Sequence, residues 1–131
     1  MKLLLDTHIW IWSHLEPWKI TSEVTRELGD PHNELWLSPI SVWELVLLVE
    51  KKRLELHQDP GAWVQQSMRE LDLQEATLTA AVADELRFTL LGYRDPGDRF
   101  LVATAKVYGL TLVTADQRLQ QIPNIQLLAN L

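Results

Sequence analysis

Four acidic residues stand where a β-strand is expected to give way to a helix: Asp6, Glu44, Asp98 and Asp116. In an open α/β sheet, the carboxyl ends of parallel strands share one edge, and ligand sites lie at that edge. Carboxylates that are crowded together repel one another and resist ionising at the same time. A divalent cation is the usual reason for gathering such groups. The four residues therefore predict a cation-binding pocket at one edge of a parallel sheet.

Glu44 also has a purely structural interpretation. The segment from Ser41 to Glu44 fits a capping box, in which the glutamate would only reach back to the amide of Ser41. Pro39 favours a different helix start, because proline suits the first helical position and Ser38 would then be the cap. In that arrangement Glu44 lies in the second helical turn and is free to point at the sheet edge.

The aspartates have structural interpretations too. Asp6 could cap a helix that begins near His8, since aspartate is a preferred N-cap residue. Asp116 follows a second apolar strand in the same way, which favours a shared pocket over two separate caps.

Asp95 directly precedes a proline and is expected to be an N-cap. Asp98 then lies in the first helical turn, where the helix dipole favours a negative charge with or without a function. The pocket therefore depends on Asp98 more than on Asp95.

The elements that must position these side chains follow from the hydrophobic pattern. Apolar runs of strand length alternate with longer amphipathic segments, which predicts βα units and a parallel sheet. We expect an α/β fold in a single domain over 1–131, with a central parallel sheet of four to five strands flanked by helices. The predicted strands are 2–6, 34–38, 72–76, 110–114 and 125–128. The predicted helices are 8–15, 20–28, 39–53, 60–70, 79–91 and 96–108, with a short turn at 116–121.

Composition narrows the class of protein. With 131 residues, 47% of them apolar and 23% charged, the chain is typical of a globular protein. The absence of cysteine excludes disulfides and thiolate metal sites. The net charge of −6 argues against a broad basic surface that coats nucleic acid. The apolar start is too short for a signal peptide, and no stretch reaches the roughly 18 apolar residues of a membrane span, so we expect a cytoplasmic protein.

Histidine and tryptophan give weaker signals. The four histidines lack metal-ligand spacing, and only His8 lies near a proposed site residue. Among six tryptophans, Trp36 and Trp43 fit the core. Trp10 and Trp12 lie two apart on a predicted helix and therefore point roughly 200° apart. At least one of them should lie on a surface that another chain covers, and Trp12 is the first candidate.

The sequences around the acidic residues match those of a known family. The chain resembles PIN-domain ribonucleases and, more narrowly, the VapC toxins of bacterial toxin–antitoxin pairs. The resemblance runs from Met1 to the C-terminus, with all motifs in family order. It rests on Leu5-Asp6-Thr7-His8, on Ser38-Pro39-Ile40-Ser41-Val42-Trp43-Glu44-Leu45, on Asp95-Pro96-Gly97-Asp98-Arg99-Phe100 and the apolar residues after it, and on Leu112-Val113-Thr114-Ala115-Asp116.

The resemblance implies a metal-dependent endoribonuclease. Asp6, Glu44, Asp98 and Asp116 take the four acidic positions that hold Mg²⁺ or Mn²⁺, and Thr114 takes the hydroxyl position beside the last of them. A free cytoplasmic ribonuclease would damage its own cell, and the resemblance implies a small VapB-like antitoxin as inhibitor, together with a homodimer. Truncation of Trp12 is expected to weaken antitoxin binding and to leave nuclease activity unchanged.

Two positions depart from the family pattern. Tyr93 stands where relatives often have histidine, and Gly97 where they often have an aromatic residue. Both touch the expected pocket rim and leave the acidic set complete.

The expected chemistry is hydrolysis of an RNA phosphodiester. Mg²⁺ prefers oxygen ligands, so carboxylates without cysteine or histidine suit it, and the bound ion would activate a water for in-line attack. One alternative is a phosphatase with an aspartate nucleophile, but Asp6 lacks the second aspartate two residues later that such enzymes use. The other is a binding module without catalysis, which a nuclease assay with and without EDTA would identify.

Overall fold

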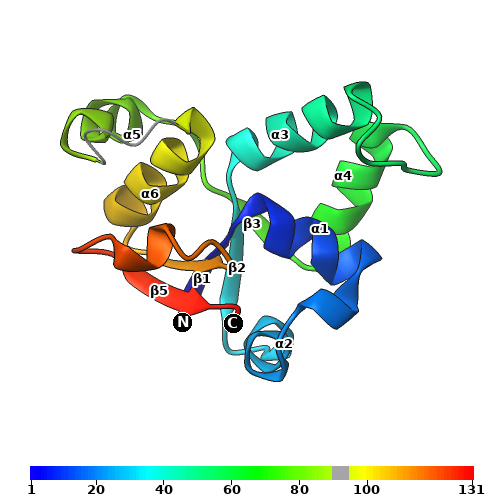
Figure 1. Ribbon diagram of the computed structural model, residues 1–131, viewed down its shortest axis with the longest axis horizontal. Coiled ribbons are helices and arrows are strands. Elements are labelled where there is room, and N and C mark those ends of the chain that lie inside the picture. Colours follow the sequence, from blue (N-terminus) through cyan, green and yellow to red (C-terminus); the bar gives the residue numbers. More distant parts are fainter. Residues whose placement is uncertain (90–94) are drawn as a thin grey trace.

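The computed structural model describes residues 1–89 and 95–131, and its centre is a parallel sheet (Figure 1). The sheet has five strands in the order β3-β2-β1-β4-β5. Their bounds are Lys2–Leu5 for β1, Glu34–Leu37 for β2, Leu73–Glu75 for β3, Thr111–Thr114 for β4 and Gln126–Ala129 for β5. Each of the five predicted strands is confirmed within two residues at either end. All four neighbouring pairs are parallel.

The strand order places a switch point between β1 and β4. From β1 the chain builds outward through β2 and β3 on one side, and through β4 and β5 on the other. Ligand sites of open α/β sheets lie outside the carboxyl ends of strands at such a point. The register pairs Leu5 with Val113, and the Asp6 amide donates to the Val113 carbonyl at 3.0 Å. The residues that follow β1 and β4 therefore begin side by side.

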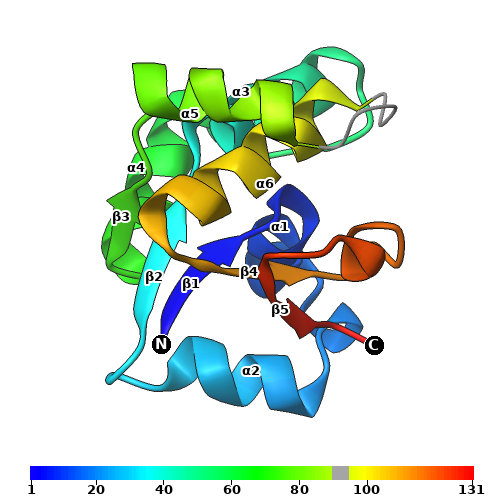
Figure 2. The same cartoon turned by 90° about the vertical axis from the view of Figure 1, so that its left-hand side faces the viewer.

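Alternation along the strands divides the core between two faces. Leu3 and Leu5 point into one cluster, whereas Leu4 between them points into the other. The first face is covered by α1 (Thr7–Leu15), α2 (Ser22–Gly29) and α4 (Pro60–Glu70), and the second by α6 (Pro96–Tyr108), with α5 (Ala80–Glu85) against α6 (Figures 1 and 2). Because both faces are covered, the central strands β1 and β4 are almost wholly buried and largely apolar, as is typical of parallel sheets.

Helix α3 (Pro39–Glu50) crosses the carboxyl edge of the sheet and packs against α1, α4 and α6 (Figure 2). It begins directly after β2, and the side chain of Ser38 caps it through the amide of Ile40 at 3.0 Å. Proline occupies the next position, as predicted, and the same pair of cap and proline opens α4 after Asp59 and α6 after Asp95. These starts fix which residues of each helix face the sheet edge.

Some helix bounds differ from the prediction. Thr21 caps α2, which therefore begins at Ser22, and α3 ends at Glu50 instead of continuing to 53. The predicted helix 79–91 is α5 followed by a 3₁₀ turn, Leu86–Phe88, and its last two positions lie outside the described residues. Two further 3₁₀ turns, Pro17–Lys19 and Leu119–Gln121, connect other elements.

Trp43 was expected in the core, and this expectation is wrong because its side chain is 52% exposed. Within α3 only Ser41 and Leu45 are buried, so the core contacts a narrow stripe of an otherwise apolar helix. Trp36 packs, partly buried, against the second cluster, and Trp10 is fully buried in the first. Among the described residues no helix is long and apolar enough to span a membrane.

Candidate functional site

A pocket of about 330 Å³ opens at the carboxyl edge of the sheet, beside the switch point. It contains all four of the predicted acidic residues, from four different parts of the chain. The residues that line it are Asp6, His8, Trp12, Glu44, Asp95, Asp98, Ala115, Asp116 and Arg118. The convergence predicted from the sequence is therefore present, with Asp95 and Arg118 added to it.

Asp6 follows β1 directly and performs two tasks. One carboxylate oxygen accepts from the Thr7 amide at 2.7 Å and caps α1, and the other accepts from the Thr114 hydroxyl at 2.6 Å. The cap and the pocket are thus both correct interpretations of this residue. Burial raises the pKa of Asp6, and the negative charge of Asp116 adds to this, whereas the hydrogen bond from Thr114 opposes it.

Glu44 points from the second turn of α3 towards Thr7. Its Oε1 lies 2.7 Å from the Thr7 hydroxyl, which also lies 2.9 Å from Ser41 Oγ. The single hydroxyl proton of Thr7 belongs with the carboxylate, because a charged acceptor makes the stronger bond. Ser41 then donates to Thr7, and the capping box is not formed. Burial is the main cause that raises the pKa of Glu44, and the charges of Asp6 and Asp95 add to it.

The other two acidic residues share a cation from the chain itself. Asp116 lies just beyond β4, and its two oxygens accept from Arg118 Nε at 3.1 Å and from Nη2 at 2.8 Å. The same Nη2 is 3.8 Å from Oδ2 of Asp98, in the first turn of α6. Thr114 connects this region to the first, because its hydroxyl accepts from the Asp116 amide at 3.0 Å while donating to Asp6.

The rim combines a helix cap and aromatic rings. Asp95 caps α6 as predicted, accepting from the Gly97 amide at 3.0 Å, and it also lines the pocket. A Cβ atom at Gly97 would lie 3.1 Å from the Glu44 carboxylate, so this departure from the family pattern leaves room for Glu44. Tyr93, the other departure, lies outside the described residues. On α1, the rings of His8 and Trp12 are 5.7 Å apart.

The chemistry of the lining residues fits a hard divalent cation, because five carboxylates supply oxygen donors in one pocket. The donors are not assembled into a closed shell, since no three acidic or histidine side chains among the described residues are close enough to share one ion. Asp6 and Glu44 are held by hydroxyl groups, and Asp116 is held by Arg118. An ion shared by three of these carboxylates would therefore require their side chains to move closer together.

Sequence reasoning missed two members of the site. Thr7 was named only as part of a motif, although its hydroxyl joins α1 to α3 through Glu44. Arg118 was not considered, although the spacing gives a local signal. Its amide donates to Asp116 Oδ1 at 2.9 Å in a turn, and such a turn brings a side chain two residues later back towards the aspartate.

Other candidate sites are less suited to chemistry. A cavity of about 210 Å³ between α2 and the sheet is lined by residues such as Leu28 and Leu35 and has no titratable side chain in its lining. Ser67 Oγ lies 2.6 Å from His14 Nε2, an arrangement that resembles a nucleophile and its base. Ser67 is only 2% exposed and also accepts from the Trp10 indole at 2.8 Å, so this contact holds α1 to α4.

Comparisons with known proteins agree with the fold. A family model for the PIN domain matches residues 3–125. Ribonuclease VapC22 of Mycobacterium tuberculosis is 32% identical over 121 residues, which is 90% of this chain and 89% of the relative. The chain belongs to the PIN-domain family.

Solved structures share the fold at lower identity. VapBC2 from Rickettsia felis, bound to a DNA fragment from its promoter, superimposes with a TM-score of 0.68 at 21% identity and covers 98% of both chains. FitAcB from Neisseria gonorrhoeae gives a TM-score of 0.63 at 22% identity, over 98% of this chain and 97% of the other. The similarity extends over nearly the whole length in each case.

Proposed function

We propose that this protein is a divalent-metal-dependent endoribonuclease that acts as the toxin of a type II toxin–antitoxin pair. The observation that carries the proposal is the meeting of Asp6, Glu44, Asp98 and Asp116 in one pocket at the switch point of the sheet. The 32% identity to a relative named as a ribonuclease supports the same activity. One nuclease domain over 1–131, acting on RNA in the cytoplasm, is the corresponding organisation.

The proposed cation is Mg²⁺, with Mn²⁺ able to substitute. Asp6 and Asp98 are the first candidates to hold it, and Glu44 and Asp116 hold it with them or orient the attacking water. When bound, the ion supplies an activated water and neutralises charge on the phosphate oxygens. Thr114 fixes the Asp6 carboxylate through its 2.6 Å hydrogen bond, so that one oxygen direction stays constant. The raised pKa of Glu44 makes this carboxylate a group that can accept a proton from water.

The proposed partners are RNA, a small VapB-like antitoxin and a second copy of this chain. An acidic pocket is a natural acceptor for an arginine or lysine of an inhibitor, because such a cation can stand in for the metal. The exposed Trp43 on α3 supplies apolar surface for association with another chain.

The first prediction tests the nuclease. Asp6→Asn or Asp98→Asn should reduce Mn²⁺-dependent cleavage of total RNA at least about a hundredfold. Each removes a charged group from the proposed metal site, and a bound metal stabilises the transition state by several kcal/mol. Asparagine keeps the oxygen that caps α1, so circular dichroism should remain unchanged for Asp6→Asn. Asp59→Asn is the matched control, since Asp59 caps α4 outside the pocket. Undiminished cleavage by well-folded Asp6→Asn protein would refute the assignment, and EDTA-resistant activity would refute the metal.

A further inference from the structure

Arg118 makes an ion pair inside the pocket with carboxylates of the proposed metal site. Its guanidinium group engages both oxygens of Asp116, at 2.8 Å and 3.1 Å, and lies 3.8 Å from Asp98. Among the described residues that line the pocket, it is the one with a permanent positive charge. Both of its carboxylate partners belong to the proposed metal-binding set.

The backbone and the side chain of Arg118 are held in different ways. The turn is held by two bonds that do not involve the Arg118 side chain, since the Arg118 amide donates to Asp116 Oδ1 and the Leu119 amide to the Asp116 carbonyl. The Arg118 side chain is 67% exposed, whereas that of Asp98 is only 12% exposed. Because the guanidinium is largely exposed, water can solvate it away from the carboxylates. The guanidinium can therefore leave Asp116 without loss of the turn.

A second pair in the chain shows what an ordinary surface contact looks like. Arg87 binds Asp84 at 2.9 Å and 3.4 Å, with both side chains more than 60% exposed. Asp84 lies on α5 and is not part of the pocket lining. Asp116, in contrast, is only 23% exposed and stands in a cluster of carboxylates. The Arg118 pair thus neutralises a charge that the fold has placed against other negative charges.

We propose that Arg118 alternates between two acceptors during the reaction: the carboxylates of Asp116 and Asp98 in the metal-free enzyme, and a phosphate of the RNA once a cation is bound. This inference rests on the proposed function. A divalent ion at Asp116 would lie next to the guanidinium, and the repulsion between the two positive charges favours release of the arginine. The released guanidinium stays tethered two residues from the site, and its planar fork matches two phosphate oxygens. Arg118 is therefore a competitor of the metal and a ligand of the substrate.

The two roles predict effects of opposite direction for one substitution. Arg118→Ala should bind Mn²⁺ about three- to tenfold more tightly than wild type, measured by calorimetric titration without RNA. The same variant should show a KM for a short single-stranded RNA raised about tenfold at saturating Mn²⁺, with kcat changed less than about threefold. Loss of one phosphate contact should also lower the salt slope of RNA binding by about 0.7.

Arg87→Ala is the matched control, because it removes the same charge from a similar pair outside the pocket. It should change neither Mn²⁺ affinity nor KM by more than about twofold. If Arg118→Ala binds Mn²⁺ no more tightly than Arg87→Ala, the competition is refuted. If its KM equals that of wild type, the phosphate contact is refuted. The Mn²⁺ titration needs no catalysis, so absence of cleavage by wild type would refute the proposed function without affecting this arm of the test.

Discussion

The two sides of the pocket hold their carboxylates by different means. On one side, Asp6 and Glu44 accept hydrogen bonds from hydroxyl groups of Thr114 and Thr7, at 2.6 Å and 2.7 Å. On the other side, Asp98 and Asp116 face the guanidinium of Arg118. We call these the hydroxyl side and the arginine side. A hydroxyl group fixes the direction of a carboxylate and leaves its charge in place, whereas an arginine neutralises the charge and can move away.

This difference gives the two sides different tasks. The hydroxyl side keeps its geometry with or without a cation, because Thr7 and Thr114 are buried and belong to regular elements. On this side the charged forms of the carboxylates are disfavoured, since burial raises the pKa of both Asp6 and Glu44. On the arginine side, the positive charge of Arg118 offsets the repulsion between the carboxylates of Asp98 and Asp116, and it also disfavours a cation there until the arginine moves away. A preformed half and an adjustable half therefore share one pocket.

The largest effect in the comparison is expected at Thr114, because its hydroxyl contacts both sides. Thr114→Val keeps the shape of the buried side chain and removes the bonds to the Asp6 carboxylate and to the Asp116 amide. Removal of a group that orients a metal ligand commonly lowers metal affinity or activity by about 10- to 100-fold. We therefore expect RNA cleavage to fall by about that factor. The amide of Asp116 would lose its partner, and stability should fall by about 1–3 kcal/mol.

Thr111→Val is the control for this substitution. Thr111 is also buried on β4, but its hydroxyl bonds to the Gln126 side chain at 3.1 Å, at the opposite end of the strand. Urea denaturation and RNA cleavage should be measured for both variants. If Thr111→Val reduces cleavage as strongly as Thr114→Val, the effect belongs to the strand, and the link between the two sides is refuted.

A smaller effect is expected for antitoxin binding at the rim of the hydroxyl side. Truncation of Trp12 was expected to leave nuclease activity unchanged, but Trp12 lines the pocket together with Asp6 and His8, so we now expect an effect on cleavage as well. Trp12→Ala should weaken binding of the adjacent small gene's product about thirtyfold, or about 2 kcal/mol, in a calorimetric titration. It should also reduce RNA cleavage several-fold, because the truncation changes the pocket wall.

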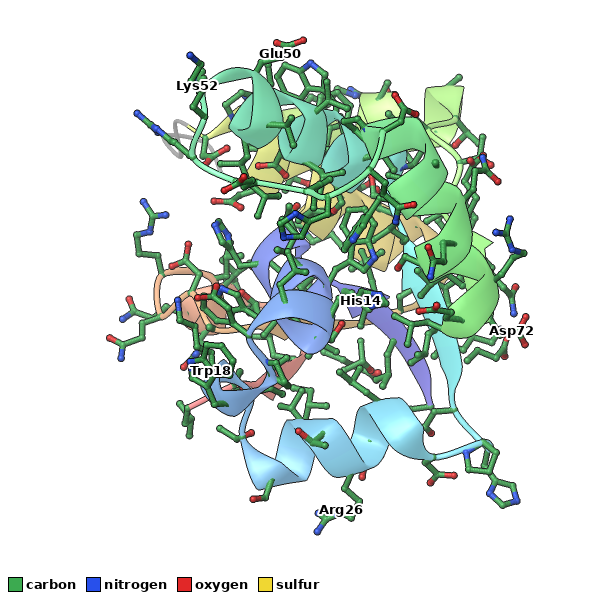
Figure 3. All side chains as sticks on the ribbon, turned by 90° about the vertical axis from the view of Figure 1, so that its right-hand side faces the viewer. His14, Trp18, Arg26, Glu50, Lys52 and Asp72 are labelled. Carbon is green, nitrogen blue, oxygen red and sulfur yellow. The ribbon has the colours of Figure 1, made fainter. Side chains whose placement is uncertain are left out.

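Trp18 offers a matched control for this truncation. It is 75% exposed on the 3₁₀ turn after α1, at the surface of the molecule (Figure 3), and it does not line the pocket. Trp18→Ala should change partner affinity and cleavage by less than about twofold. If Trp18→Ala abolishes binding while Trp12→Ala leaves it intact, the partner covers the outer surface of this turn and not the pocket rim.

The parts of the fold that were predicted correctly depend on short stretches of sequence. Strands appear as apolar runs. Ser38 and Asp95 each precede a proline and cap a helix, as predicted, and Asp59 does the same. The gathering of acidic residues also followed, because parallel strands present their carboxyl ends at one edge. These features require no knowledge of which helix packs on which.

The missed parts depend on contacts between distant segments. The bond between Thr7 and Glu44 spans 37 positions, and only the placement of α3 across α1 brings these residues together. Trp43 was misplaced for a related reason. Helix α3 is apolar on nearly every side, so its periodicity does not identify the face that meets the core. Side-chain pairing and the choice of a buried face are set by packing, which the local pattern does not contain.

The smallest effect separates the two sides by their stability without metal. The pKa of Asp6 is raised above 3.8 in the folded state, chiefly by burial, so the folded protein binds this proton more tightly than the unfolded chain. The free energy of unfolding therefore increases as pH falls through the raised pKa, and ionised Asp6 destabilises the fold above it. Asp6→Asn removes this term, and its metal-free melting temperature at pH 7 should exceed that of wild type by a few degrees. The difference should shrink as pH falls towards 3.8.

Asp98→Asn should gain less stability than Asp6→Asn, because Arg118 and the N-terminus of α6 already favour the Asp98 charge. Melting curves in EDTA between pH 4 and 8 measure both variants, and added Mn²⁺ should stabilise wild type more than either. Equal gains for the two variants at pH 7 would contradict the division of the pocket into an uncompensated hydroxyl side and a compensated arginine side.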